Sequence, residues 1–299
     1  MQAVPKVIFK QWQAPGDLLM LTVAIRDLHK MYPVLMETDV LSCYPEVFFN
    51  NPYITHYPKD GSIPIVDLKY DKARDKLAPL GYHFSDVFIY ILNELYDLKI
   101  MKTSMRPDIH LTNNEKSENI LDKLEIKKPY WLINSGVKHD IPVKGYPPSK
   151  WEIVINSLVD KGLNIYQVGS YFDIHPTHNR IKSLVGKTEN LRDYFSLVYH
   201  SSGCIGHVSM QMHLAAAFHK PCVVIGGGRE DCRWEGYPDH RYLNTVGLLD
   251  CCRETGCWIS KIEDCKHPWK NSPYPLCLAK IKPERIVKEV LDYVLLINL

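Results

Sequence analysis

Strand-like and helix-like segments alternate along this chain, and this alternation limits its possible folds more than any other feature. Residues 7–9 are a short β-branched and aromatic run, and apolar residues then recur at helical spacing over residues 18–31. Strand-like runs at 34–36 and 63–68 follow, and then an amphipathic helix at 85–98. Strands separated by helices predict a parallel sheet with helices on both of its faces.

The alternation stops at a polar segment, residues 112–129, and then begins again. The second half contains strand-like and helix-like runs at residues 130–134, 151–161, 163–168, 191–199, 203–206, 210–218, 221–225 and 281–296. Domain boundaries fall in polar segments of this kind. We therefore expect two α/β domains, 1–125 and 126–299.

Bulk composition excludes several classes of protein. The 299 residues are enough for two domains, and 36 Lys and Arg nearly balance 34 Asp and Glu. Net charge therefore gives no support for nucleic-acid or membrane binding, although a local basic patch stays possible. No run reaches the roughly 18 apolar residues of a spanning helix, and the first residues do not resemble a secretory signal. A cytoplasmic location is the default expectation.

Four segments, in order, resemble glycosyltransferase family 9, which includes the lipopolysaccharide heptosyltransferases. The first is Gly-Asp-Leu-Leu at 16–19, and the second is Ile-Asn-Ser-Gly at 133–136 with Lys-Gly-Tyr-Pro at 144–147. The third, at 205–217, contains Met-His-Leu-Ala-Ala-Ala and is the most specific. The fourth runs from Lys-Pro at 220–221 to Gly-Gly-Gly-Arg-Glu at 226–230.

The resemblance implies an α/β chain of the GT-B class, with two Rossmann-like domains facing each other across a cleft. It also implies an inverting mechanism and a nucleotide-diphosphate sugar donor, ADP-heptose being the expected type. Domain 1–125 would bind the acceptor. Domain 126–299 would bind the donor and would include a Cys-rich loop (251–277) and a C-terminal helix. One departure is visible: the family usually has Asp-Ser-Gly where this chain has Val208, Ser209 and Met210.

Asp17 is the candidate catalytic base. An inverting transferase needs one group to accept the proton of the acceptor hydroxyl. Asp17 lies at a strand-to-helix turn, where ligands of α/β proteins bind, and Gly16 before it is a candidate donor-contacting residue. The alternative interpretation is that Asp17 only caps the N-terminus of the helix that follows.

Positive charge and helix ends could stabilise the departing diphosphate. Ser209 opens an apolar helix, and His213 lies one turn further in, where it could contact the donor or simply be a core histidine. Lys144 could neutralise phosphate charge or be an ordinary surface lysine. Trp234 could stack on the base or pack in the core. The other candidate donor-binding residues are Ser135, Gly136, Gly169, Gly227, Gly228, Arg229 and Glu230. Arg229 would contact the diphosphate, and Glu230 a ribose.

Five cysteines cluster near the C-terminus, in a turn-rich segment: Cys251, Cys252, Cys257, Cys265 and Cys277. Four thiolates in a short segment can form a tetrahedral zinc or iron site. Relatives among the autotransporter heptosyltransferases carry a cysteine-bound iron in this region, which the resemblance extends to this chain. The alternative is free, buried thiols. Any such metal would be structural, and no catalytic metal is expected.

The sequence thus favours an inverting sugar transferase whose acceptor is a glycan, a protein or modified nucleic acid. Oligomerisation is compatible with this interpretation. Two alternatives remain open at this stage. One is a nucleotide-sugar epimerase or hydrolase on the same fold, and the other is a non-catalytic module stabilised by metal.

Overall fold

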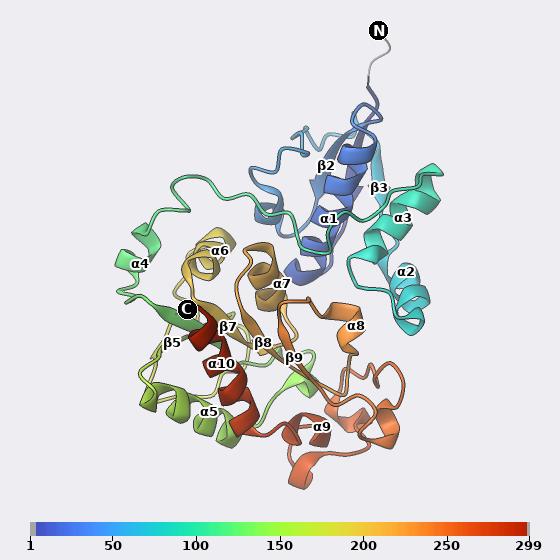
Figure 1. Cartoon of the computed structure of the whole chain (residues 1–299). Helices are drawn as coiled ribbons and strands as arrows, with labels where there is room; N and C mark the ends of the chain where they lie inside the picture. Colours follow the sequence, from blue (N-terminus) through green and yellow to red (C-terminus); the bar gives the residue numbers. More distant parts are fainter. Residues whose placement is uncertain (1–3, 298–299) are drawn as a thin grey trace. The chain divides into compact units, whose positions relative to one another are not determined.

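The structure is a computed structural model, and it describes residues 4–297. The chain divides into two compact units, Met1–Asn114 and Glu115–Leu299, each an α/β unit with its own parallel sheet (Figure 1). This division lies N-terminal to the boundary expected at 125/126. The two units are described separately below.

The first unit contains a three-stranded parallel sheet in the order β2-β1-β3. Helices α1 and α3 pack against one another, as do α2 and α3. The elements are β1 (Lys6–Lys10), α1 (Pro15–Met31), β2 (Glu37–Leu41), η1 (Pro45–Phe48), β3 (Ile65–Asp67), α2 (Tyr70–Leu77), η2 (Ala78–Leu80) and α3 (Asp86–Tyr96).

Helix α1 begins earlier than the sequence pattern indicates. Its N-cap is Ala14, and Pro15 occupies the first helical position, where the missing N–H of proline costs no hydrogen bond. No side chain caps the helix, so the interpretation of Asp17 as an N-cap is wrong. Asp17 lies instead in the first turn, where a carboxylate interacts favourably with the helix dipole.

The second unit contains a six-stranded parallel sheet in the order β6-β5-β4-β7-β8-β9. Its strands are β4 (Tyr130–Asn134), β5 (Asn164–Gln167), β6 (Lys182–Ser183), β7 (Gly203–His207), β8 (Cys222–Gly227) and β9 (Arg241–Asn244). The helices before, between and after them are α4 (Asn119–Lys123), η3 (Pro142–Lys144), α5 (Pro148–Asp160), α6 (Leu191–His200), α7 (Met210–Ala217), α8 (Cys232–Glu235) and α10 (Pro283–Ile297).

The central strands of this sheet are buried on both faces, which is why they are almost continuously apolar. One core cluster joins Trp151 and Leu158 of α5 to Ile286 and Val290 of α10 and to the sheet. Helices α6 and α7 pack together and lie on the other side of the sheet (Figure 1). The closing helix α10 is therefore part of the second unit's core.

The segment between β9 and α10 has little regular structure. It contains η4 (Asp250–Cys252), η5 (Ile262–Asp264), η6 (Trp269–Asn271) and α9 (Leu276–Ala279), each only three or four residues long. Within residues 4–297, no helix combines the length and the hydropathy that crossing a bilayer requires.

Candidate functional site

The strand order of the second unit fixes where a ligand can bind. From β4 the chain proceeds outward to β5 and β6, and it then returns to the other side of β4 to form β7, β8 and β9. Ligands of open α/β sheets bind beyond the carboxyl ends of the strands, at the point where the order reverses. Here that point lies between β4 and β7, and Ser135 and Ser209 follow these two strands.

Ser209 is the N-cap residue of α7, as the sequence pattern predicts. Its side chain does not cap the helix, and its buried Oγ has no hydrogen-bond partner among the residues that the structure describes. A buried hydroxyl without a partner is energetically costly. Together with the free N–H groups of the first helical turn, this hydroxyl could bind phosphate oxygens.

Ser135 is 1% exposed and belongs to a polar network beside the end of β4. Gln167 Nε2 donates to Ser135 Oγ over 3.1 Å and to Pro176 O over 2.8 Å. His178 Nε2 lies 3.1 Å from the same Oγ. Burial lowers the pKa of His178, so this imidazole stays neutral at neutral pH. The network holds the loop after β5 against the end of β4.

Gly136 and Gly169 make room for a side chain that the sequence analysis missed, His175. A Cβ added to either glycine would lie 2.2 Å from Cε1 of His175. His175 Nε2 donates to Ser170 O over 2.8 Å, and Nδ1 is buried without a hydrogen-bond partner among the described residues. In this structure both glycines therefore accommodate an imidazole at the strand ends where phosphate approach was expected.

His207, at the end of β7, connects two loops of this region. The backbone N–H of Tyr146 donates to His207 Nε2 over 3.0 Å, so the ring proton is on Nδ1, which donates to Gly136 O over 3.1 Å. Burial, reinforced by the positive charge of Lys144, lowers the pKa of His207 to about 4. The neutral ring thus fixes the position of the loop that carries Lys144.

Lys144, Arg229 and Glu230 form a cluster of charges. Lys144 Nζ lies 3.1 Å from Glu230 Oε1, and the guanidinium of Arg229 binds the same oxygen. Arg229 also donates from Nε to Ile259 O over 2.6 Å. Glu230 is 4% exposed, so the carboxylate expected at a ribose is buried between two cations. The cluster keeps one excess positive charge, which favours an anionic ligand.

His213 and Trp234 lie in the interior of the second unit. His213 Nδ1 is 2.7 Å from the hydroxyl of Tyr237, and its Nε2 is 3.8 Å from Glu235 Oε2. Trp234 is 2% exposed and packs edge-on against Trp258, with 5.6 Å between the ring centroids. These contacts favour the core interpretation of both side chains.

Asp17 and Gly16 occupy the matching place in the first unit. Strand β1 lies between β2 and β3, so the loop after β1 is at that sheet's reversal point. Gln11 fixes this loop: its Nε2 donates to Leu68 O over 3.2 Å, and its Oε1 accepts from the backbone N–H of Trp12 over 2.9 Å. Asp17 is half-buried in the turn that follows.

All five clustered cysteines line one cavity of about 230 Å³ in the second unit. The other lining residues are Val143, Gly228, Arg229, Leu249, Ile259, Asp264, Lys266, His267 and Pro275. A Cβ on Gly228 would lie 2.8 Å from Cys252 Sγ, so only glycine leaves space for that thiol. The five cysteines that cluster in the sequence thus lie around one cavity, which we call the thiol pocket.

Burial acts against free thiolates in the thiol pocket. It raises the pKa of Cys251 to about 11 and that of Cys277 to about 12, and it also raises the pKa of Cys257. Neighbouring thiols add to each of these shifts. A bound cation would reverse this preference, because metal coordination deprotonates thiols.

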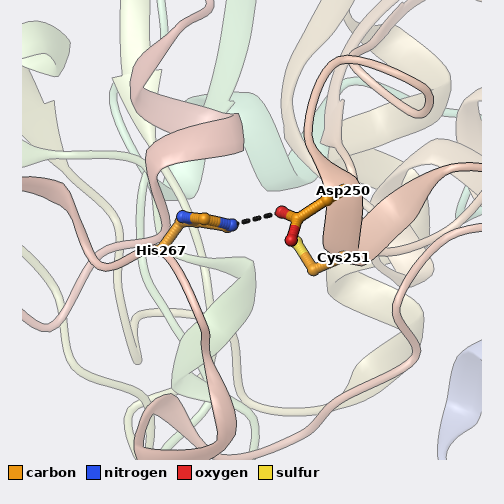
Figure 2. A group of neighbouring side chains, drawn as sticks. All are labelled: Asp250, Cys251 and His267. Carbon is orange, nitrogen blue, oxygen red and sulfur yellow. Dashed lines mark hydrogen bonds and ion pairs between the residues drawn. The ribbon is translucent and has the colours of Figure 1, made fainter.

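Two more potential ligands lie beside Cys251. Asp250, Cys251 and His267 each offer one ligand atom, and the three atoms lie within 4.8 Å of one another. His267 Nε2 is hydrogen-bonded to the carboxylate of Asp250, and Figure 2 shows the three side chains pointing toward one another. In the sequence, only the cysteines of this segment stood out as metal ligands. The adjoining Asp-Cys and the nearby His were the signal that was missed.

Comparison with known proteins identifies the family of this chain. The family model described as glycosyltransferase family 9 (heptosyltransferase) matches residues 47–255. No curated protein matches the chain.

Three solved structures share the fold. The family 9 glycosyl transferase from Veillonella parvula DSM 2008 is 13% identical, with a TM-score of 0.68 and coverage of 97% of each chain. The ADP-heptose LPS heptosyltransferase II of E. coli is 14% identical, with a TM-score of 0.65, over 99% of this chain and 100% of that one. TibC, an iron-containing dodecameric glycosyltransferase from enterotoxigenic E. coli H10407, is 16% identical, with a TM-score of 0.69, over 98% and 77%.

Proposed function

The chain belongs to glycosyltransferase family 9 and is a glycosyltransferase, and from this premise we propose that it transfers a heptose-like sugar from an ADP-linked donor to an acceptor hydroxyl. The family match includes most of the second unit, with its strand reversal between β4 and β7. The observation that carries the proposal is the unpartnered, buried hydroxyl of Ser209 at the N-terminus of α7, beside this reversal.

Two neighbouring cations support a diphosphate ligand at this place. The loop that carries Lys144 is bound to the end of β7 through Tyr146 and His207, and Arg229 follows β8, the next strand. Ammonium and guanidinium groups both bind phosphate, the guanidinium with two parallel hydrogen bonds. A solved structure of TibC in complex with ADP-D-beta-D-heptose supports the adenine nucleotide and the heptose as the first donor to test.

The proposed reaction is a single displacement. The acceptor oxygen attacks the anomeric carbon, the bond from that carbon to the diphosphate oxygen breaks, and ADP leaves with the bonding electrons. Asp17 accepts the hydroxyl proton, and Lys144, Arg229 and the N-terminus of α7 stabilise the diphosphate. One displacement inverts the anomeric configuration. The place of Asp17 in the turn after β1 supports its role as the base.

The thiol pocket fits a structural metal. Its five sulfur atoms are soft ligands in one cavity, which suits zinc or iron. We propose that four thiolates, from Cys252, Cys257, Cys265 and Cys277, bind the ion, and that Cys251 is the fifth, separate thiol. The described iron content of TibC supports this assignment. The ion would cross-link the irregular segment before α10 and take no part in the displacement.

Replacing Asp17 tests the chemistry. In an assay with ADP-heptose and a panel of glycan, protein and nucleic-acid acceptors, Asp17→Asn should lower kcat by roughly 10²- to 10⁴-fold. Donor affinity, measured by calorimetry, should stay at the wild-type value. The matched control is Asp67→Asn, because Asp67 is a half-exposed carboxylate at the end of β3 in the same unit.

Three results would contradict the proposal. An unchanged kcat in Asp17→Asn excludes this carboxylate as the base. Retention of the donor's anomeric configuration in the product, read by NMR, excludes a single displacement. Donor turnover at the same rate with and without acceptor would instead favour the hydrolase or epimerase alternative.

A further inference from the structure

Among the five cysteines of the thiol pocket, Cys251 also has a carboxylate and an imidazole as close neighbours. Cys252 donates from Sγ toward Thr245 O and Leu249 O, at 3.7 and 3.5 Å, and it packs against Gly228. Its neighbour in sequence, Cys251, adjoins the Cys252 thiol and in addition lies with the carboxylate of Asp250 and the imidazole of His267 (Figure 2). The Cys251 sulfur, an Asp250 oxygen and a His267 nitrogen are thus close enough to bind one metal ion.

The separations of these ligand atoms are close to those in a metal site. Bonds of roughly 2.0–2.3 Å at tetrahedral angles place ligand atoms about 3.3–3.8 Å apart. The three atoms here all lie within 4.8 Å of one another. Small side-chain rotations are therefore enough to close the set around an ion. The side chains of Asp250 and His267 are 55% and 35% exposed, so they are free to make such rotations.

The backbone holds both contributing segments in place. Asp250 and Cys251 belong to η4, whose last residue, Cys252, donates its N–H to Leu249 O over 3.1 Å and accepts from Gly247 N over 2.7 Å. The carbonyl of His267 accepts from Leu276 N over 2.8 Å. The ligands are therefore anchored on two separate segments, which lowers the entropy lost on binding.

We propose that Asp250, Cys251 and His267 bind one divalent transition-metal ion at a second site, separate from the four-thiolate site of the thiol pocket. We call it the rim site. One thiolate, one imidazole and one carboxylate suit zinc, cobalt or ferrous iron, whereas magnesium and calcium prefer oxygen ligands alone. Three protein ligands at an exposed position leave the fourth position to water, so the ion exchanges with solvent.

The rim site differs from the thiolate site in how accessible its ion is to solvent. Cys252 and Cys277 are 1% and 7% exposed, so an ion bound there is enclosed by the chain. An ion at the rim site would connect η4 to the segment that carries His267 and remain accessible to chelators. The proposal does not depend on sugar transfer, because every measurement below reads metal binding.

The test counts metal ions in the full chain. Protein stripped by a strong chelator and reloaded with zinc or cobalt is desalted, and its metal content is measured by mass spectrometry. His267→Ala and Asp250→Asn should each remove one ion per chain and abolish the cobalt absorption that reports a site with a single thiolate. Cys251→Ser should do the same. Because the side chains of Asp250 and His267 are partly exposed, we expect these variants to fold, and circular dichroism checks this.

Matched variants separate the two sites. Asp264→Asn removes a carboxylate that lines the thiol pocket but lies outside the rim site, and it should leave the metal content unchanged. Cys257→Ser should disrupt the thiolate site and leave the rim ion bound. A wild-type chain whose single ion depends on His267 would support the rim site and contradict the thiolate site.

Two results would overturn the inference. One is full metal content and an unchanged cobalt spectrum in both His267→Ala and Asp250→Asn. The other is loss of the His267-dependent ion in Cys257→Ser, because that ion would then belong to the thiolate set.

Discussion

Two regions of the second unit meet at residues 227–230 and are stabilised in different ways. The charged region, which comprises Lys144, Arg229 and Glu230, lies at the ends of regular parallel strands. The thiol pocket lies in a segment whose helices are three or four residues long. The first region depends on the sheet for its geometry. The second has little regular structure, so a cross-link through bound metal would contribute more to its order.

The two regions share one residue. Arg229 binds Glu230 in the charged region and lines the thiol pocket. The cysteine segment is also hydrogen-bonded to the backbone at Gly228 and Arg229: Cys257 N donates to Gly228 O and Trp258 N donates to Arg229 O, each over 3.2 Å. The comparison therefore predicts that damage to the pocket reduces stability first and donor binding second. Removal of a single cation from the charged region should reduce donor binding alone.

The largest expected effect comes from removing the metal proposed for the thiol pocket. Chelation, or Cys257→Ser, should cost roughly 4 kcal/mol or more of stability, as is typical when a structural metal is lost. Limited proteolysis should then cut within residues 245–281 before any other part of the second unit. Cys43→Ser is the control, because Cys43 is an exposed thiol in the other unit. An unchanged melting temperature after verified metal loss would remove the distinction between the regions.

The next effect concerns His207, which stabilises the charged region. Its pKa is about 4 in the folded chain and near 6.5 when unfolded, so between these values only the unfolded chain binds the proton. Stability due to neutral His207 is therefore complete above pH 6.5 and falls by about 3 kcal/mol as the pH decreases to 4. Urea unfolding of His207→Gln should show a smaller loss over this range.

The control for that measurement is His139→Gln, because His139 is exposed. Its pH profile should follow that of the wild type. A His207→Gln profile that also follows the wild type would show that other groups account for the acid sensitivity, and that the charged region does not depend on this ring.

Lys144→Met tests the charged region, where we expect a loss of ADP affinity without a loss of stability. Removing one charged phosphate contact costs roughly 1.5–3 kcal/mol, or about 10- to 150-fold in the dissociation constant for ADP. The melting temperature of the free protein should change little, because Glu230 keeps its bond to Arg229. Lys138→Met, at an exposed lysine in the same loop, is the control. Equal ADP affinity in the two variants would remove Lys144 from the donor site.

The smallest effect is expected for Ser209→Ala. Loss of one neutral hydrogen bond to phosphate should weaken ADP binding by about 0.5–1.5 kcal/mol, which is several-fold. Because the hydroxyl has no partner among residues 4–297, the free protein should be as stable as the wild type or slightly more so. A loss of stability without a change in ADP affinity would show that Ser209 serves the fold instead.

The parts of the fold that sequence could predict are those whose apolar runs are unbroken. Strand β4 lies where its pattern places it, because its first four residues are apolar or aromatic and buried. Helix α6 lies almost where its pattern places it, although it buries Arg192 and Ser196 beside its apolar residues. Strand β2 does not: the prediction of a strand at 34–36 is wrong, and the strand is Glu37–Leu41. Its centre contains buried Thr38 and Asp39, which are satisfied by residues distant in sequence. Thr38 Oγ1 donates to Tyr53 O, and Asp39 Oδ2 accepts from Tyr57 N.

The candidate site also could be predicted from the sequence only in part. The clustering of five cysteines in the sequence marked them as candidate metal ligands, and the order of the segments predicted which loops would lie at the strand ends. It could not predict that His175 would fill the space above Gly136 and Gly169, because that contact depends on the path of the loop after β5. Nor could it predict that Glu230 would be buried between two cations.

The packing of His175 on the two glycines has a consequence for interpreting variants of this enzyme. A scan of all substitutions would show that positions 136 and 169 tolerate almost nothing, and this would usually be ascribed to ligand contact. Here the intolerance has a steric origin at both positions, since any Cβ would overlap the imidazole, and at position 169 the φ of 151° adds backbone strain. Alanine at position 136 should become acceptable once residue 175 is also made small, whereas position 169 should still require glycine because of its φ of 151°. Positions 136 and 175 therefore form an epistatic pair, in which the size of one residue sets the permitted size of the other.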